Sequence, residues 1–334
     1  MSNNSVRCYN RRTMKTLKLL LLMMLLAGVT VAQTPKTQTP QQQTPPKPSG
    51  DEISTLRVNA TLVNTLFTVA DKKGKFITNL KQADFKVYED EKPQTVTAFS
   101  NESNLPLSIG LLVDVSGSIR DRLRFEQEAA IEFFYSTLHR GKDRGMVISF
   151  DSLPELIQDF TDDPEVLADA VRKIRAGGGT SLYDAIYVAV SEKLSKESQQ
   201  RRKVLIVISD GDDNSSRLSM TETLDLAQRN NVTIYCISTN ASTNNSSKEA
   251  ERGDKTLKRF SDETGGKTFF PLKLTDLASS FTDIGEELRS QYTIGYQSAR
   301  IDDGTFRRIR IDVLNKNFKT RHRTGYYAPK SSSK

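Results

Sequence analysis

Three small oxygen-bearing side chains occupy alternate positions in the stretch LLVDVSGSIRDR: Asp114, Ser116 and Ser118. They follow an apolar run from Ile109 to Val113, which predicts a strand buried on both faces. Carboxylate and hydroxyl oxygens suit a hard cation such as Mg²⁺, which prefers an octahedron of oxygens and readily keeps some waters. By itself, however, the pair Ser118 and Asp121 is more typical of a capping box at the start of a helix.

Two later segments carry side chains of the same kind. Asp210 ends the apolar run of KVLIVISDGDD, and Thr180 follows glycines 177–179 in AGGGTSLYDAI. In an open doubly wound sheet, ligands bind beyond the carboxyl ends of the strands, at the point where the strand order reverses. If the strands that end at Asp114 and Asp210 are neighbours there, two carboxylates and several hydroxyls converge. One metal site then explains all of these positions.

Each segment also has a simpler explanation. GGGT is commonly a loop, and it lacks the Gly-Lys-Ser/Thr ending of a phosphate-binding P-loop. SDG is a common turn after a strand. Asp210, Asp212 and Asn214 are spaced as in an EF-hand. However, Ser215 and Thr221 stand where that loop needs its glycine and its final glutamate.

The chemistry of the combined site favours docking over catalysis. Two carboxylates formally neutralise a divalent ion, which stays electrophilic towards a further ligand if either carboxylate acts through a water. We expect that ligand to be a carboxylate from another molecule. Asp184, in SLYDAI, is expected to cap or orient the glycine loop rather than to bind the metal directly.

Strands and helices alternate from Leu107 to Arg289. Helical spacing in RDRLRFEQEAAIEFFYSTLHR follows the first strand, and GMVISF and ELIQDF, separated by DSLP, predict a hairpin. The helices DPEVLADAVRKI, with Pro164 in its first turn, and LYDAIYVAVSEKL follow. Then come KVLIVIS, TETLDLAQRN, VTIYCIS, KTLKRFSDETG, KTFFPL and TDLASSFTDIGEELRS, alternately strand and helix. This order predicts an α/β domain over residues 105–289 with a doubly wound, mainly parallel sheet.

In the segments on either side, residues 53–104 and 290–328, apolar and polar residues alternate with period two, as in strands that expose one face to solvent. In the second segment Ile309 and Ile311 share one face. Because a segment of about 50 residues is marginal as a domain, we expect the two to form one β-sandwich-like domain with the α/β domain inserted. The basic residues between 307 and 323 are expected on its wet face, with docking to an acidic surface as the alternative.

The N-terminus is typical of a secretory signal peptide. Residues 1–32 combine basic residues, an apolar stretch from Leu19 to Val31 and Ala32 at its end, and the stretch is too short for a comfortable membrane span. An uncleaved anchor is the alternative. Residues 33–52, rich in Pro, Gln and Thr, predict a disordered linker, and residues 329–334 a short tail. The protein is therefore expected to be exported, periplasmic or secreted, with no stable membrane span after cleavage.

Charge and reactive side chains exclude several functions. Residues 1–32 hold five Lys or Arg and no Asp or Glu, so the net charge of +7 falls to +2 without them and gives no case for nucleic acid. Cys8 precedes the apolar stretch, which leaves Cys236 as a small buried strand residue without a disulfide partner. With only His139 and His322, zinc hydrolysis and Ser-His-Asp chemistry lack their parts.

The segment DVSGSI, the threonine after the glycines and the aspartate of SDG resemble the metal-ion-dependent adhesion site of the von Willebrand factor type A domain family. That family's pattern is Asp-x-Ser-x-Ser after the first strand, then a Thr, then an Asp after a later strand, and no position is substituted here. The resemblance covers residues 105–289 and implies a Rossmann-like sheet with one antiparallel edge strand. It implies a site for Mg²⁺, or for Mn²⁺ or Ca²⁺, with these ligands: Asp114, Ser116, Ser118, Thr180 and Asp210. More loosely, the flanks resemble secreted bacterial proteins that carry this domain.

Together these features predict a non-enzymatic adhesion or protein-binding module that docks an Asp or Glu carboxylate of a protein partner through the ion. The resemblance also implies that the last helix, residues 275–289, shifts on ligand binding and reorients the sandwich that follows it. One alternative is a metal-dependent phosphoester hydrolase, which needs a nucleophilic Asp or a third carboxylate and a general acid near the ion. The other is a purely structural envelope protein that assembles through the sandwich.

Overall fold

A computed structural model describes residues 61–101, 104–116, 123–240, 247–300 and 303–330. The chain divides into two units, Met1–Thr55 and Leu56–Lys334, and all of the described residues belong to the second. The predicted signal peptide, the predicted linker and Ser118 lie outside the described residues, so they stay predictions. Within the part of the chain that is described, no helix is long and apolar enough to cross a membrane.

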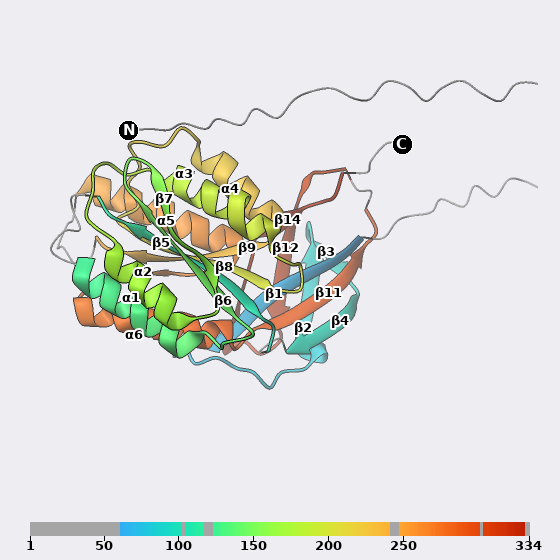
Figure 1. Ribbon diagram of the computed structural model, residues 1–334. Coiled ribbons are helices and arrows are strands. Elements are labelled where there is room, and N and C mark those ends of the chain that lie inside the picture. The colour runs from blue at the N-terminus through green and yellow to red at the C-terminus, as the bar shows by residue number, and fades with distance from the viewer. Residues whose placement is uncertain (1–60, 102–103, 117–122, 241–246, 301–302, 331–334) are drawn as a thin grey trace, which may run out of the picture. The chain divides into compact units, whose positions relative to one another are not determined.

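A six-stranded sheet with the strand order β10-β9-β8-β5-β6-β7 forms the centre of the α/β part (Figure 1). Its strands are β5 (Leu107–Asp114), β6 (Arg144–Phe150), β7 (Pro154–Thr161), β8 (Arg202–Ser209), β9 (Val232–Ser238) and β10 (Thr268–Phe269). All neighbours are parallel except β6 and β7, which form the predicted hairpin at one edge. The strand order reverses between β5 and β8, which are buried along their whole length.

Helices cover both faces of this sheet (Figure 1). They are α1 (Leu123–Thr137), α2 (Pro164–Lys173), α3 (Leu182–Val188), α4 (Met220–Arg229), α5 (Lys248–Thr264) and α6 (Leu274–Leu288), and α3 continues into the short turns η3 (Ala189–Lys193) and η4 (Leu194–Lys196). Side chains of α1, α2 and α6 pack on one face of the sheet, and those of α3, α4 and α5 on the other. Helix α2 begins as its sequence predicts, with Pro164 in the first turn and the Asp163 carboxylate accepting the N–H of Glu165.

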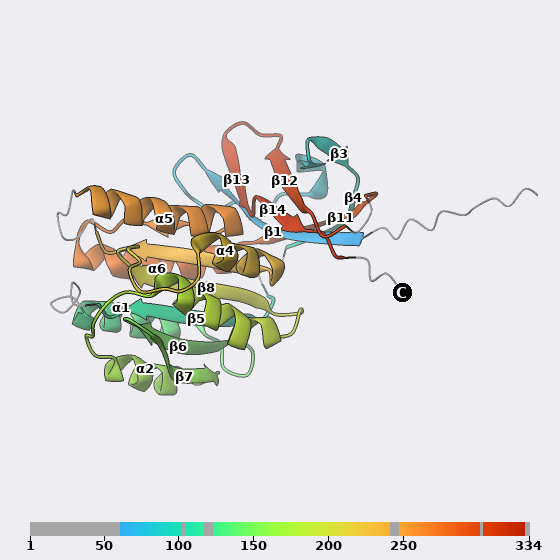
Figure 2. The ribbon, with the colours of Figure 1, turned by 90° about the horizontal axis from the view of Figure 1, so that it is seen from above.

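Two four-stranded antiparallel sheets, β13-β1-β11-β4 and β14-β12-β2-β3, lie beside the α/β part (Figure 2). Their strands, with one short turn η1 (Gln82–Asp84), are β1 (Thr61–Asp71), β2 (Phe85–Glu89), β3 (Lys92–Gln94), β4 (Val96–Asn101), β11 (Tyr292–Ser298), β12 (Phe306–Val313), β13 (Phe318–His322) and β14 (Gly325–Tyr327). Strand β1 pairs with β11 and β13, and β2 pairs with β12. Between the sheets the ring of Phe67 packs against those of Phe85 and Tyr292. The predicted fold class, an α/β sheet flanked by a β-sandwich of N- and C-terminal strands, is confirmed.

The basic residues between 307 and 323 were expected on the solvent-exposed face of the sandwich. This prediction is wrong at Arg307, whose side chain is fully buried. Period two places Arg307 on the same face of β12 as Ile309. Its charge is balanced by the buried Glu89, 3.9 Å away, and its Nη1 donates to the Ser298 hydroxyl at 2.9 Å. Glu89 in turn accepts hydrogen bonds from the hydroxyls of Ser298 and Tyr326, both at 2.8 Å. The sandwich core therefore encloses a hydrogen-bonded polar network.

Candidate metal centre

Asp114 is the last residue of β5, and its carboxylate lies at the carboxyl end of the sheet, beside the end of β8. The residue is 1% exposed. Its Oδ1 accepts the backbone N–H of Ser116 at 2.9 Å, and its Oδ2 accepts the hydroxyl of Ser209 at 2.7 Å. These two hydrogen bonds fix the orientation of the carboxylate.

A second carboxylate, that of Asp210, lies close to the first. Burial raises the pKa of Asp114 to about 6, the hydrogen bonds from Ser116 and Ser209 oppose this rise, and the charge of Asp210 adds to it. Asp210 follows β8, is half-buried, and its Oδ1 accepts the N–H of Asp212 at 3.0 Å. Two carboxylates in this arrangement repel each other, and a cation bound beside them would stabilise both in their charged form.

The glycine loop packs directly against the end of β5. The N–H of Gly177 donates to the carbonyl of Val115 at 2.5 Å, and the N–H of Gly178 donates to Oδ2 of Asp151 at 3.1 Å. A Cβ atom on Gly177 would lie 2.2 Å from that same carboxylate oxygen. With glycine here the Asp151 carboxylate keeps this position, and the loop is held against both β5 and the β6–β7 turn.

Thr180 is held in place by its backbone. Its N–H donates to Oδ1 of Asn214 at 3.0 Å, and its carbonyl accepts the N–H groups of Asn214 and Ser215, each at 3.0 Å. The residue is 4% exposed. Its hydroxyl makes no hydrogen bond to any described residue, which leaves the oxygen lone pairs available to a ligand.

Asp184 supports the loop that follows β8. Its carboxylate accepts the backbone N–H groups of Arg217 and Leu218 at 3.1 Å, so it orients that loop rather than the glycine loop. Asn214, which the EF-hand alternative requires as a ligand, already accepts the N–H of Thr180 through its side-chain oxygen. The loop after β8 is therefore organised around the glycine loop, and not as a calcium-binding loop of its own.

Three chain segments meet at the carboxyl ends of β5 and β8. They carry four of the five residues that the sequence singled out, Asp114, Ser116, Thr180 and Asp210, whereas Ser118 lies outside the described residues. Ser209, which holds Asp114, is a residue that the sequence reasoning missed. Its signal was its position immediately before Asp210, at the end of a strand expected to neighbour β5.

The donor set consists of carboxylate and hydroxyl oxygens, which fit a hard cation such as Mg²⁺, Mn²⁺ or Ca²⁺. Within the described residues, no three His, Cys, Asp or Glu side chains gather as a metal site. Cys236 is buried in β9, as predicted. The site is thus chemically distinct from the sulfur and imidazole sites typical of structural zinc.

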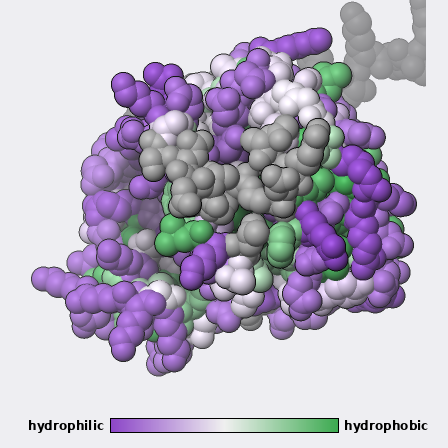
Figure 3. Space-filling view, turned by 90° about the vertical axis from the view of Figure 1, so that its left-hand side faces the viewer, coloured by the Kyte–Doolittle hydropathy of each residue, from purple (hydrophilic) through white to green (hydrophobic). Residues whose placement is uncertain are grey.

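Figure 3 shows the surface at the end of the molecule to which these strands point. Most of the coloured surface in this view is hydrophilic, with smaller hydrophobic areas between the hydrophilic ones. Beside the centre, Val115, Asp151 and Leu153 line a hollow of about 380 Å³ that Lys173 and Arg175 also border. Leu153 is 66% exposed. The rim of the centre therefore offers an approaching molecule an apolar side chain, two cations and the carboxylates of Asp151 and Glu155.

We compared the chain with protein families, curated proteins and solved structures. Residues 109–212 match the family model of the von Willebrand factor type A domain. The search of curated proteins gives no match.

Solved structures similar to the chain include BatB, a conserved hypothetical protein from Bacteroides thetaiotaomicron (15% identity, TM-score 0.44, covering 55% of this chain and 100% of that one). A von Willebrand factor type A protein from Catenulispora acidiphila has 14% identity and a TM-score of 0.47, covering 75% and 74%. A third structure is that of proximal thread matrix protein 1 from the mussel byssus with a zinc-occupied MIDAS (metal-ion-dependent adhesion site) motif. It has 14% identity and a TM-score of 0.47, and the match covers 60% of this chain and 49% of that one. On the match over residues 109–212 and the strand order of its central sheet, the chain carries a von Willebrand factor type A domain.

Proposed function

We propose that the protein is an exported, non-enzymatic binding module that docks a carboxylate of a partner protein through a divalent cation. The residues that would hold the ion are Asp114, Ser116, Ser118, Thr180 and Asp210. A bound ion would supply the bridge, with oxygens of this chain on one side and an Asp or Glu of the partner on the other. The observation that carries the proposal is the buried Asp114 carboxylate, oriented by Ser209 and close to Asp210.

The hollow beside the centre supports docking of a protein rather than of a free ion alone. Leu153 offers apolar contact area, and Lys173 and Arg175, which share the hollow with Asp151 and Glu155, offer positive charge to residues that flank the partner's acid. Cations at the rim of an interface raise association rates and select partners more than they add affinity. A partner with an acidic side chain next to an apolar one therefore fits this surface.

Calorimetric titration of Mg²⁺, Mn²⁺ and Ca²⁺ into the metal-stripped protein tests the ion site. We expect one-to-one binding, weakened by at least about tenfold in Asp114→Asn and in Thr180→Val, since even outer-shell changes weaken metal sites that much. Asp212→Asn is the matched control, because Asp212 is an exposed carboxylate two residues from Asp210. Equal loss in Asp212→Asn would favour the EF-hand alternative, and wild-type protein that binds no ion, alone or with acetate, would contradict the proposal.

The partner is tested with peptides that differ only in one acidic side chain. A Mg²⁺-dependent interaction with an Asp- or Glu-containing peptide, lost with the matching Asn or Gln peptide and lost in Asp114→Asn, supports docking through the ion. Hydrolysis of a generic phosphoester, abolished by Asp114→Asn, would instead support the hydrolase alternative.

Export is tested by fractionation of cells and by the N-terminal sequence of the protein recovered. We expect the protein in the periplasm or the medium, beginning at Gln33, because Ala32 ends the predicted signal peptide. A protein that retains residues 1–32 in the membrane fraction would show an uncleaved anchor instead.

A further inference from the structure

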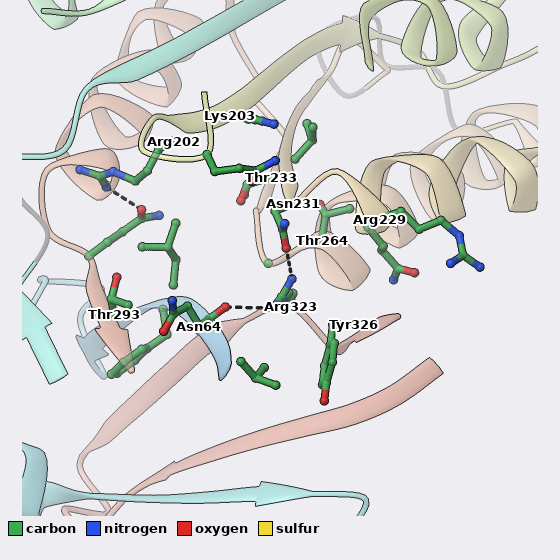
Figure 4. Close-up of a pocket in the computed structure, with 18 of the residues that line it drawn as sticks. Asn64, Arg202, Lys203, Arg229, Asn231, Thr233, Thr264, Thr293, Arg323 and Tyr326 are labelled. Carbon is green, nitrogen blue, oxygen red and sulfur yellow. Dashed lines mark hydrogen bonds between the residues drawn. The ribbon is translucent and has the colours of Figure 1, made fainter. Parts of the chain in front are cut away.

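A cavity of about 530 Å³ lies between the α/β part and the β-sandwich, at the end of β8 opposite the metal centre. Arg202, Lys203 and Thr233 line it from the beginning of β8 and β9, and Asn64 and Arg323 line it from the sandwich side (Figure 4). This volume lies within the range of about 300–1,000 Å³ that is usual for small-molecule sites.

The wall of this cavity is strongly basic. Among the described residues that line it, none is Asp or Glu, and six are Lys or Arg: Arg201, Arg202, Lys203, Arg229, Arg321 and Arg323. A concave surface with one sign of charge and low-dielectric walls concentrates ions of the opposite sign. The cavity therefore attracts anions.

Four of these cations are engaged by neighbouring groups. Arg321 donates both to Oε1 and to Oε2 of Glu287, at 2.9 and 2.7 Å. Arg202 donates to the side-chain oxygen of Gln291 at 2.6 Å. Arg201 lies 3.6 Å from a Glu197 oxygen, and the guanidinium of Arg229 stacks 3.7 Å above the ring of Tyr327. These four side chains build the wall and are held in place without a ligand.

Lys203 differs from them because its ammonium group is buried and unpartnered. The residue is 3% exposed, and its Nζ has no hydrogen-bond partner among the described residues. A buried polar group is normally hydrogen-bonded, and a buried charge is normally paired. Burial lowers the pKa of Lys203, which the nearby Glu197 only partly opposes. An anion in the cavity would supply the missing partner.

Arg323 faces the cavity from the sandwich side. It donates to the side-chain oxygen of Asn231 and, at 2.9 Å, to the carbonyl of Asn64, so both of its neighbours are neutral (Figure 4). Within the described residues no carboxylate forms an ion pair with it. Its guanidinium is thus held rigidly in place while its charge is not neutralised.

We propose that this cavity binds a small organic polyanion, whose carboxylate or phosphate groups pair with the ammonium of Lys203 and the guanidinium of Arg323. Asn231 and Thr233 add neutral donors on the same wall. The site is separate from the metal centre, since none of the cavity-lining residues is a proposed metal ligand.

The proposal is tested on the purified protein in EDTA, which keeps the metal centre out of the measurement. Citrate and pyrophosphate serve as probes for the carboxylate and the phosphate classes, against sodium chloride of equal ionic strength. We expect one-to-one binding of at least one probe, weakened at least tenfold by Lys203→Met and by Arg323→Gln. Lys258→Met, which removes an exposed lysine of α5 outside the cavity, keeps the wild-type affinity.

Thermal unfolding in chloride alone shows that the variants are folded, and Lys203→Met is expected to be no less stable than the wild type because it removes a buried unpaired charge. Binding of citrate only assigns a carboxylate ligand, and binding of pyrophosphate only assigns a phosphate ligand. If neither probe binds, or if Lys203→Met binds as tightly as Lys258→Met, the proposal is wrong and Lys203 has a packing role alone.

Discussion

The hydroxyl of Ser209, at the end of β8, donates a 2.7 Å hydrogen bond to Oδ2 of Asp114, at the end of β5. This bond joins the two strands at the point where the strand order of the sheet reverses. The same hydroxyl accepts the N–H of Gly211 at 3.0 Å, so it also fixes the start of the loop that contains Asp210. Ser209 therefore positions the Asp114 carboxylate and the backbone that flanks Asp210.

Ser209→Ala is expected to weaken Mg²⁺ affinity by about tenfold or more, because it frees the Asp114 carboxylate without removing a proposed ligand. Calorimetric titration measures this. Ser238→Ala is a matched control: Ser238 stands opposite Ser209 on the neighbouring strand but donates to Asp254, at 2.6 Å. Unchanged affinity in Ser209→Ala would show that the hydrogen bond to Asp114 has no part in ion binding.

Gly177→Ala is expected to displace the Asp151 carboxylate, since the new Cβ would lie 2.2 Å from its Oδ2, and so to break the hydrogen bond by which Gly178 ties the glycine loop to it. The predicted loss in the free energy of unfolding is about 1–3 kcal/mol, together with weaker metal binding. Gly178→Ala places its Cβ no closer than 3.4 Å to Ser152, and its loss is expected to stay within about 0.5 kcal/mol. Urea unfolding compares the two variants, and equal stability would contradict the prediction.

Glu287→Gln is expected to lower the free energy of unfolding by about 1–3 kcal/mol. Glu287, in the last turn of α6, is buried, and it accepts two hydrogen bonds from Arg321 on β13 and one from Thr68 on β1. The loss is smaller than for a fully buried pair because the Arg321 side chain is 36% exposed. The exposed neighbour Glu286 provides the control, and Glu286→Gln should unfold at the wild-type urea concentration.

The sandwich is expected to lose stability in mild acid through His322. Its Nε2 accepts the N–H of Ile311 at 3.2 Å, and its Nδ1 lies 2.7 Å from the carbonyl of Arg323, so the ring is neutral with the proton on Nδ1. Burial lowers its pKa below the ordinary 6.5. As the pH falls below that value, the unfolded chain binds a proton that the folded chain does not, and the free energy of unfolding decreases.

Urea unfolding from about pH 7.5 to about pH 5.5 measures this loss, at most about 1.4 kcal/mol per pH unit for one group. In His322→Asn the corresponding part of the acid dependence should disappear. An identical pH dependence in the variant and the wild type would mean that other groups cause the loss.

Much of the fold could be predicted from the sequence because its two kinds of strand differ in the pattern of their apolar residues. The runs that became the middle of β5 and β8 are continuously apolar, as strands covered on both faces require, and the two strands end at Asp114 and Ser209. The pairing of β1 with β11 followed from two half-apolar segments that were each too short to stand alone.

The parts that could not be predicted depend on which side chain meets which neighbour. Every residue of β8 is buried, so burial alone did not distinguish Ser209, as a partner of Asp114, from its neighbours in the strand. Arg307 followed the alternation of β12, but its charge suggested the solvent-exposed face, and its burial is explained by Glu89 on another strand together with Asp303 and Ser298. Lys203 is the second residue of β8, ahead of its apolar run, and its unpartnered ammonium became apparent only with the sandwich packed beside it.

The interleaved sandwich also has a consequence for the order of folding. The chain leaves the ribosome from its N-terminus, so β1 to β4 are synthesised long before their partners β11 to β14. All strands of the central sheet, by contrast, come from the continuous segment between β5 and β10, which can complete its fold first. Until synthesis ends, β1 has two unpaired edges, and closing the sandwich requires slow, long-range pairing. A chain that stops before β11 is therefore expected to aggregate through β1, even though its central sheet is complete.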